Sequence, residues 1–241
     1  RPRDWSSDVC SSDLCNPYTS TLGAIMAPAG SAITGVEALK GKKFGVAGGA
    51  LDKSWLLLQA WARRKGFDVR KEAQVVFGAP QLLAVKLEQG ELDAVMNYWN
   101  LCAELEAKGF RRVVEMSQVE HELGAKGAVA MIGYAFEQAF AAKNGAALTR
   151  YFKIANQAKE ALAADAAEWP RIASRTGISD AKTLEILRKR YGDGIPRRSL
   201  DDEEADARAL YQVLVDVGGA ELAGPARELP RGLYWGAGSG G

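Results

Sequence analysis

Short apolar segments alternate with amphipathic ones through the first half of the chain. Four of them have the length and composition of buried strands: 43–47, 73–77, 93–98 and 112–116. The segments between them repeat with a helical period, at 52–65, 81–88 and 101–108. Strands that alternate with short helices predict βαβ units and a mostly parallel sheet.

The segment 52–65 shows this pattern most clearly. Asp52 is a good N-cap residue, and Gly66 follows the last periodic position as a stop. Leu51, Trp55 and Leu58 recur at helical spacing and form one apolar stripe. We therefore expect a helix here whose apolar stripe packs on the sheet.

Two further apolar strands, at 21–27 and 128–134, lie on either side of this α/β block. After them the pattern becomes helical, with helices expected at 136–142, 148–164, 166–175, 180–191 and 201–217. A chain that leaves a block and returns to it is typical of a two-lobe protein. We expect lobe II at 34–122, parts of lobe I at 15–33 and 123–241, and a hinge at the two flanking strands.

Composition narrows the class of function. The chain has 241 residues, of which 47% are hydrophobic and 25% charged, so it is globular and not disordered. A net charge of +1 gives no basic field for nucleic acid. No apolar run approaches the roughly 18 residues of a membrane helix. Three cysteines and one histidine, all scattered, predict no metal site, no cofactor and no disulfide framework.

Residues 1–14 differ from the rest of the sequence. They have no hydrophobic period and are dense in Ser and Asp, and they resemble translated sequencing-adapter DNA. We therefore leave them out of the fold and expect Cys10 not to be a native cysteine. We also expect a signal peptide or lipid anchor to have been lost with the true N-terminus. Because the opening strands of lobe I would then be missing, we expect this chain to leave sheet edges unpaired.

Two stretches carry a family resemblance. Residues 39–49 read LKGKKFGVAGG and are followed by Leu51-Asp52-Lys53-Ser54, and residues 87–95 read LEQGELDAV. Their order and spacing resemble the solute-binding proteins of ABC importers of the nitrate/sulfonate/taurine type. The resemblance covers 21–134 and implies an α/β, two-lobe, type II periplasmic-binding-protein fold, here with lobe I incomplete because the family's opening units are missing.

The resemblance also implies a function. We expect a non-enzymatic protein that captures a small polar or anionic solute, such as a sulfonate, nitrate or a thiamine-pyrimidine-like molecule, between its lobes. The expected partners are this solute and the ABC permease subunits, without nucleic acid, and contact with the membrane would come only through the permease or a lost anchor. The expected location is the periplasm.

Candidate ligand-binding residues follow from the place where parallel strands end. Small molecules bind outside the carboxyl ends of such strands, near helix N-termini. The loop after 43–47 offers Gly48, Gly49, Asp52, Lys53 and Ser54, whose free N–H groups and helix dipole suit an anion. Asp52 would compete with an anion, and Asp52 and Ser54 are equally well explained as helix caps.

The remaining candidates come from the later strands. Gly78 and Ala79 form the next mouth, or a plain strand-to-helix turn. Further candidates are two aromatic residues and an amide at the end of the third strand, and three residues beside the hinge: Asn97, Tyr98, Trp99, Tyr18, Thr19 and Tyr134. Trp99 either forms an aromatic cleft wall or packs as core.

Two other functions share this fold. An enzyme of the thiamine-pyrimidine-synthase type would need clustered cysteines and a nearby histidine, whereas His121 lies in an acidic stretch and Cys102 reads as a core residue. The ligand-sensing domain of a transcription regulator would need an upstream helix-turn-helix. No catalytic residue is predicted, because no nucleophile has a base near it in the sequence.

Overall fold

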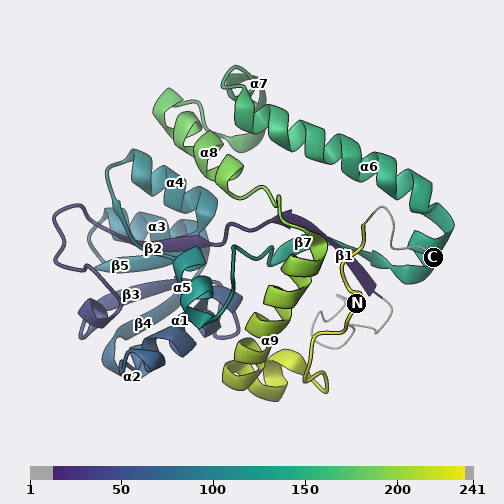
Figure 1. The fold of residues 1–241 in the computed structure, drawn as a ribbon. Coiled ribbons are helices and arrows are strands. Elements are labelled where there is room, and N and C mark those ends of the chain that lie inside the picture. Colours follow the sequence, from purple (N-terminus) through teal and green to yellow (C-terminus); the bar gives the residue numbers. More distant parts are fainter. Residues whose placement is uncertain (1–12, 237–241) are drawn as a thin grey trace, which may run out of the picture.

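The computed structural model describes residues 13–236, and its larger part is built on a mixed five-stranded sheet (Figure 1). The strands are β2 (Gly23–Ala27), β3 (Lys43–Ala47), β4 (Gln74–Gly78), β5 (Ala94–Tyr98) and β6 (Arg111–Glu115), in the order β4-β3-β5-β2-β6. β3 pairs in parallel with β4 and β5, whereas β2 runs antiparallel to both β5 and β6. The carboxyl ends of β3, β4 and β5 therefore share one edge.

Helices cover both faces of this sheet. One face packs on α3 (Pro80–Glu88) and α4 (Trp99–Ala107). The other packs on α1 (Lys53–Arg64) and α5 (Met116–Leu123), with η1 (Glu37–Leu39) and α2 (Val69–Glu72) at the rim. The sheet is thus the middle of three layers, as the alternating pattern predicts.

The helix predicted from Asp52 is confirmed as α1. Its N-cap Asp52 accepts hydrogen bonds from the backbone of the first turn, and Trp55 and Leu58 are buried in the core. Gly66 has a φ of +77° and ends the helix region, because glycine adopts this left-handed conformation without strain. Local cap and stop chemistry therefore fixes both ends of α1.

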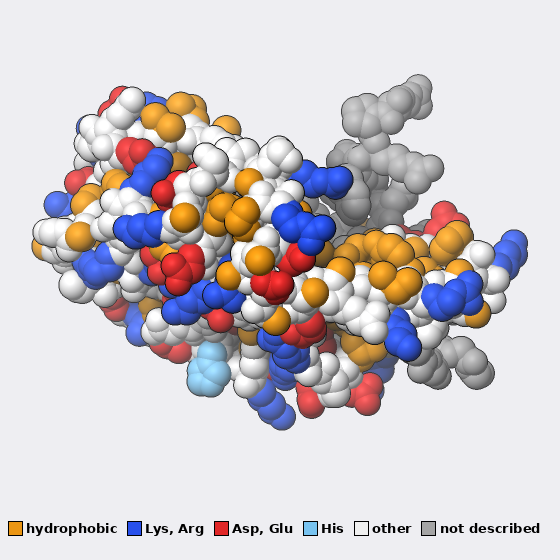
Figure 2. All heavy atoms as spheres, turned by 90° about the horizontal axis from the view of Figure 1, so that it is seen from above, with side chains coloured by type: hydrophobic (Ala, Val, Ile, Leu, Met, Phe, Trp, Pro, Cys, Tyr) orange, Lys and Arg blue, Asp and Glu red, His pale blue; other side chains and the backbone are white. Residues whose placement is uncertain are grey.

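A smaller sheet lies beside the larger part. β1 (Asp13–Thr19) pairs antiparallel with β7 (Ile132–Glu137), and the long helix α6 (Gln138–Ala164) packs on it (Figure 1). Phe152 of α6 is buried against Trp235 near the end of the described chain. Hydrophobic side chains are exposed along the arm that α6 forms, among them Tyr151 and Ile154 (Figure 2).

The last helices return to the larger part. They are α7 (Glu168–Thr176), α8 (Ala181–Asp193) and α9 (Leu200–Ala223). α8 packs on α4 and α9 on α1 and α5, so the two helices hold the larger part from opposite sides (Figure 1). Within the described residues, no helix combines the length and apolarity that a bilayer crossing requires.

Several predicted boundaries differ from the structure. The strand predicted at 21–27 is β2, which lies inside the five-stranded sheet, and its antiparallel pairing makes that sheet mixed. The strand predicted at 128–134 begins only at Ile132, because 126–131 forms an irregular crossing segment. β1 begins at Asp13, two residues inside the segment 1–14 that we set aside; Cys10 lies outside the described residues.

The chain crosses between the two sheets beside or within the two predicted flanking strands. It passes from β1 to β2 through 20–22 and returns to β7 through 124–131. The helices α8 and α9, expected in lobe I, both contact the larger part, and α8 also packs on α6. Which strands pair across such distances depends on tertiary contacts that local patterns do not contain.

Candidate functional site

The loops after β3, β4 and β5 meet at one edge of the larger sheet. The Gly48 amide donates to the Gly78 carbonyl at 3.3 Å, which joins the first two loops. The Tyr98 hydroxyl donates to Oδ2 of Asp52 at 3.2 Å, which joins the third loop to the first. Gly48, Asp52, Gly78 and Tyr98 thus come together as the strand pattern predicts.

Glycine is required at the centre of this arrangement. Gly48 has a φ of +86°, and a Cβ atom there would lie 2.9 Å from the Tyr98 hydroxyl. The neighbouring Gly49 has open space around it and is exposed. The backbone of Gly48 therefore approaches Tyr98 more closely than any other residue type would allow.

Asp52 is fully engaged within the protein. Its Oδ1 accepts from the amides of Ser54 at 2.9 Å and Trp55 at 3.2 Å, while Oδ2 accepts from Tyr98. Burial raises the pKa of this carboxyl, and its hydrogen bonds oppose the increase. The first free amides of α1 are consequently occupied by a carboxylate, and Asp52 and Ser54 have the geometry of a helix cap.

Asn97 is also engaged within the protein. It is 3% exposed, its Nδ2 donates to the Pro80 carbonyl at 2.8 Å, and its Oδ1 accepts from the Tyr98 amide at 2.8 Å. This amide links the end of β5 to the start of α3, next to the exposed Ala79. In this structure Asn97 shapes the site by holding Tyr98.

Trp99, the first residue of α4, packs against a residue that the sequence did not single out. Its ring lies 6.3 Å from the ring of Tyr191 on α8, which in turn lies 5.9 Å from Trp169. Both Trp99 and Tyr191 remain partly exposed. The position of Tyr191 at the end of an amphipathic helix was a signal in the sequence. Its contact with Trp99 could not be read from the sequence, because the two residues are 92 positions apart.

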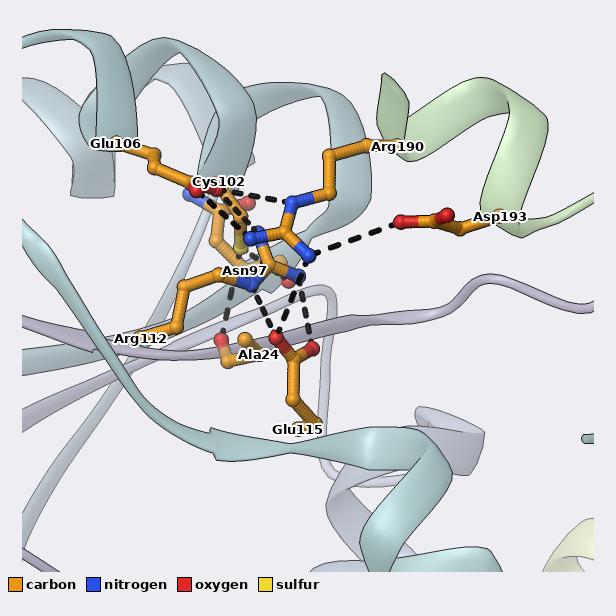
Figure 3. Close-up of polar contacts among 8 residues, drawn as sticks. All are labelled: Ala24, Asn97, Cys102, Glu106, Arg112, Glu115, Arg190 and Asp193. Carbon is orange, nitrogen blue, oxygen red and sulfur yellow. Dashed lines mark hydrogen bonds and ion pairs between the residues drawn. The ribbon is translucent and has the colours of Figure 1, made fainter. Parts of the chain in front are cut away.

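An ionic network holds α8, the helix that carries Tyr191, against the larger part, and Figure 3 shows its charged residues. Arg190, the neighbour of Tyr191 on α8, donates to Glu106 of α4 at 2.7 and 3.0 Å. Arg112 of β6 donates twice to Glu115 at 2.5 and 2.9 Å and also reaches Glu106 at 3.5 Å. Paired charges of this kind join three elements at one place, so α8 keeps a defined position on α4.

The smaller sheet contributes an aromatic group to the same region. Tyr18 and Tyr134 pack edge to face at 5.4 Å between ring centroids. Lys159 of α6 lies against both rings and donates to the Tyr18 carbonyl at 3.3 Å. Thr19, which is 8% exposed, donates to the Gly194 carbonyl at 3.1 Å and so ties β1 to the segment after α8.

Lys159 was missed from the sequence. It stands seven positions after Phe152 and shares the buried face of α6 with it. A lysine at a periodic apolar position is the signal that could have identified it. Burial lowers the pKa of its ammonium group.

Carboxylates hold the returning segment 126–131. Three buried carboxylates accept backbone N–H groups along this segment: Glu120 of α5, and Glu203 and Asp206 of α9. Asp206 accepts from Lys126 and Gly127, Glu120 from Val129, and Glu203 from Ala130. Lys53 donates from Nζ to the Met131 carbonyl at 2.7 Å, so this candidate supports the crossing segment. Burial raises the pKa of Glu120 to about 8, and Glu203 adds to the increase.

The cysteines and the histidine form no catalytic pair among residues 13–236. Burial raises the pKa of the Cys15 thiol, and burial raises that of Cys102 to about 11. Cys102 is enclosed between the carbonyls of Ala24 and Asn97 (Figure 3). His121 is exposed on α5. Both thiols are therefore protonated at neutral pH and poorly nucleophilic.

Comparison with known proteins gives a consistent family and fold. The family model described as NMT1/THI5 like matches residues 14–168. The alkanesulfonate-binding protein SsuA from Xanthomonas axonopodis pv. citri, bound to MOPS, is 20% identical with a TM-score of 0.66, covering 93% of this chain and 74% of that one. The periplasmic aliphatic sulphonate binding protein SsuA from Escherichia coli is 20% identical with a TM-score of 0.69, covering 93% and 68%.

An enzyme has the same architecture at lower similarity. The desulfurization enzyme DSZB is 16% identical with a TM-score of 0.56, covering 88% of this chain and 75% of that one. No curated protein sequence matches the chain. The fold is that of the type II periplasmic binding proteins, as predicted.

Proposed function

This chain belongs to the NMT1/THI5 like family, and we propose that it captures a small polar or anionic solute as the binding component of an ABC importer. The observation that carries the proposal is that two aromatic pairs, Trp99 with Tyr191 and Tyr18 with Tyr134, lie on two segments that are hydrogen-bonded to each other. Thr19, which follows Tyr18, donates to the carbonyl of Gly194, three positions after Tyr191. Aromatic walls with a few polar groups suit a small organic molecule.

The arrangement of the crossings supports this proposal. The two sheets are joined by short segments at 20–22 and 124–131, which a change of angle between the sheets would bend. Closure of such parts around a ligand is a common response to binding. The closed form would then be what the permease recognises, in the periplasm, the compartment named for the Escherichia coli relative.

The enzyme alternative rests on the likeness to DSZB. A thiol nucleophile needs to be deprotonated, and the raised pKa values of Cys15 and Cys102 oppose this. The chemistry of the described residues therefore favours binding without turnover. Product analysis during the ligand experiments tests the alternative directly.

The test is calorimetry with a panel of alkanesulfonates, nitrate and a thiamine-type pyrimidine. We expect binding without conversion, and we expect Trp99→Ala to weaken it by about 1–3 kcal/mol because it removes an aromatic wall. Phe140→Ala removes a half-exposed ring from the start of α6 and is the matched control with unchanged affinity. Chemical conversion that requires Cys15 would reject the proposal.

A further inference from the structure

Lys159 is a buried cation that forms no ion pair within residues 13–236, and the charge of the adjacent Glu160 acts on it only through space. It is 5% exposed, and no carboxylate among residues 13–236 lies within ion-pair distance of its ammonium group. The adjacent Glu160 is paired instead with Arg197 at 2.9 Å. A buried charge that lacks an opposite charge is costly, so this position is unfavourable unless something else compensates it.

The compensation within the protein is partial. Nζ lies 5.3 Å from the ring centroid of Tyr18 and 5.9 Å from that of Tyr134, both within the range of cation–π attraction. One of the three ammonium donors is used on the Tyr18 carbonyl. Burial lowers the pKa of Lys159, and the charge of Glu160 opposes this decrease.

Tyr191 lies near the two tyrosines of the smaller sheet. Thr19, the residue after Tyr18, donates to the carbonyl of Gly194 at 3.1 Å, and Gly194 stands three positions after Tyr191. Burial raises the pKa of Tyr191 to about 12, and the neighbouring Tyr18 and Tyr134 add to the increase. The ring of Tyr191 lies 6.3 Å from that of Trp99. Tyr18 is 36% exposed, which leaves the group reachable from solvent.

The opposite side of the site is unsuited to an anion. The amides at the start of α1 are taken by Asp52, a carboxylate that would repel a second negative charge. The positive charge of Lys53 is directed to the Met131 carbonyl of the crossing segment. Lys159 is therefore the cation best placed for a negatively charged group beside the aromatic residues.

We propose that Lys159, Tyr18, Tyr134 and Tyr191 form a subsite for the singly charged oxyanion group, sulfonate or carboxylate, of a small organic solute whose apolar part contacts Trp99. This inference rests on the proposed solute-binding function and adds the residue that selects for charge. An oxyanion there supplies the missing counter-charge and accepts the remaining ammonium donors.

The test compares two ligands on four proteins. Ethanesulfonate and the uncharged ethyl methyl sulfone are titrated by calorimetry into the full chain and into Lys159→Met, Lys159→Arg and Lys153→Met. Lys153 is exposed on the same helix and is the matched control. We expect Lys159→Met to weaken ethanesulfonate binding at least tenfold and to leave the sulfone unchanged, while Lys159→Arg and Lys153→Met retain ethanesulfonate.

The thermal midpoint of each variant, measured without ligand, shows whether it is folded. If the Lys159→Met variant binds ethanesulfonate with unchanged affinity, the proposed subsite is wrong. If Trp99→Ala nevertheless weakens ligand binding, the proposed function stands without the subsite. If no ligand of the panel binds the full chain, the proposed function fails. The subsite is then decided by NMR titration of the Lys159 side chain, whose pKa rises in ethanesulfonate if the subsite exists and stays constant if it does not.

Discussion

Replacing Glu120 by Gln should make the protein more stable at alkaline pH. Glu120 has no exposed surface, its Oε1 has no hydrogen-bond partner within residues 13–236, and its Oε2 accepts from the Val129 amide at 3.4 Å. The nearby Glu203 accepts the next amide of the same segment, from Ala130. Burial, together with Glu203, raises the pKa of Glu120 to about 8, so the folded protein holds a proton that the unfolded chain releases.

The magnitude follows from proton linkage. Below a pH of about 4.5 the carboxyl is neutral in both states, and its full contribution to stability is present. As the pH rises towards 8, the unfolded state ionises and the folded state does not, which costs about 1.4 kcal/mol per pH unit. The loss reaches about 3 kcal/mol at pH 7 and about 5 kcal/mol above pH 8. Gln keeps the shape and cannot ionise, so this loss disappears.

The assay is urea unfolding of the wild type and Glu120→Gln at intervals between pH 5 and 9. We expect similar free energies of unfolding at pH 5 and a difference of about 3–5 kcal/mol in favour of the variant at pH 8.5. Glu122→Gln is the control on the same helix. Hydrogen bonds from Trp61 and Gln118 lower the pKa of Glu122, so its contribution to stability is lost only in acid. Above pH 6 the free energy of unfolding of the control should therefore have the same pH dependence as that of the wild type, whatever its level. Parallel pH profiles for the wild type and Glu120→Gln would refute the reasoning.

Two further substitutions test how the site is built, both by urea unfolding. Gly48→Ala should lower the free energy of unfolding by about 1–3 kcal/mol, because the φ of Gly48 is +86° and the new Cβ would meet the Tyr98 hydroxyl. Gly49→Ala, in open space, should change it by less than about 0.5 kcal/mol. Equal losses for the two variants would contradict the close approach of Gly48 to Tyr98. Arg190→Met should cost about 1–3 kcal/mol by removing the paired contact with Glu106, whereas breaking the exposed Arg171–Glu168 pair should cost about 0–1 kcal/mol.

Much of the larger part could be predicted from the sequence because its signals are local. Asp52 and Gly66 bound α1 as expected, and the helix expected at 81–88 is α3, which begins at Pro80. The three loop ends at Gly48, Gly78 and Tyr98 also meet as expected, because parallel strands place their carboxyl ends at one edge. The antiparallel pairing of β2 could not be predicted, because its apolar residues fit a position inside the sheet as well as one at a hinge.

The candidate site was predicted less completely for a related reason. Asn97 was correctly placed at the end of a strand, but its side chain could satisfy Pro80 and the Tyr98 amide only once α3 lay beside β5. The role of a polar residue depends on which partners reach it, and those partners are distant in sequence. Local pattern identifies the position, and tertiary structure decides whether the group is free.

Lys159 and Tyr191 show why the helical half of the chain carries more of the site than its sequence suggests. Tyr191 reaches Trp99 because Arg190 anchors α8 to Glu106 of α4 (Figure 3). Lys159 lies 32 positions earlier on α6, which packs on both α8 and the smaller sheet. A movement of the smaller sheet relative to the larger part would therefore change the distance between the buried ammonium and the Trp99 wall. The proposed closure would therefore couple charge recognition to ligand binding, because Lys159 packs on the smaller sheet and Trp99 belongs to the larger part.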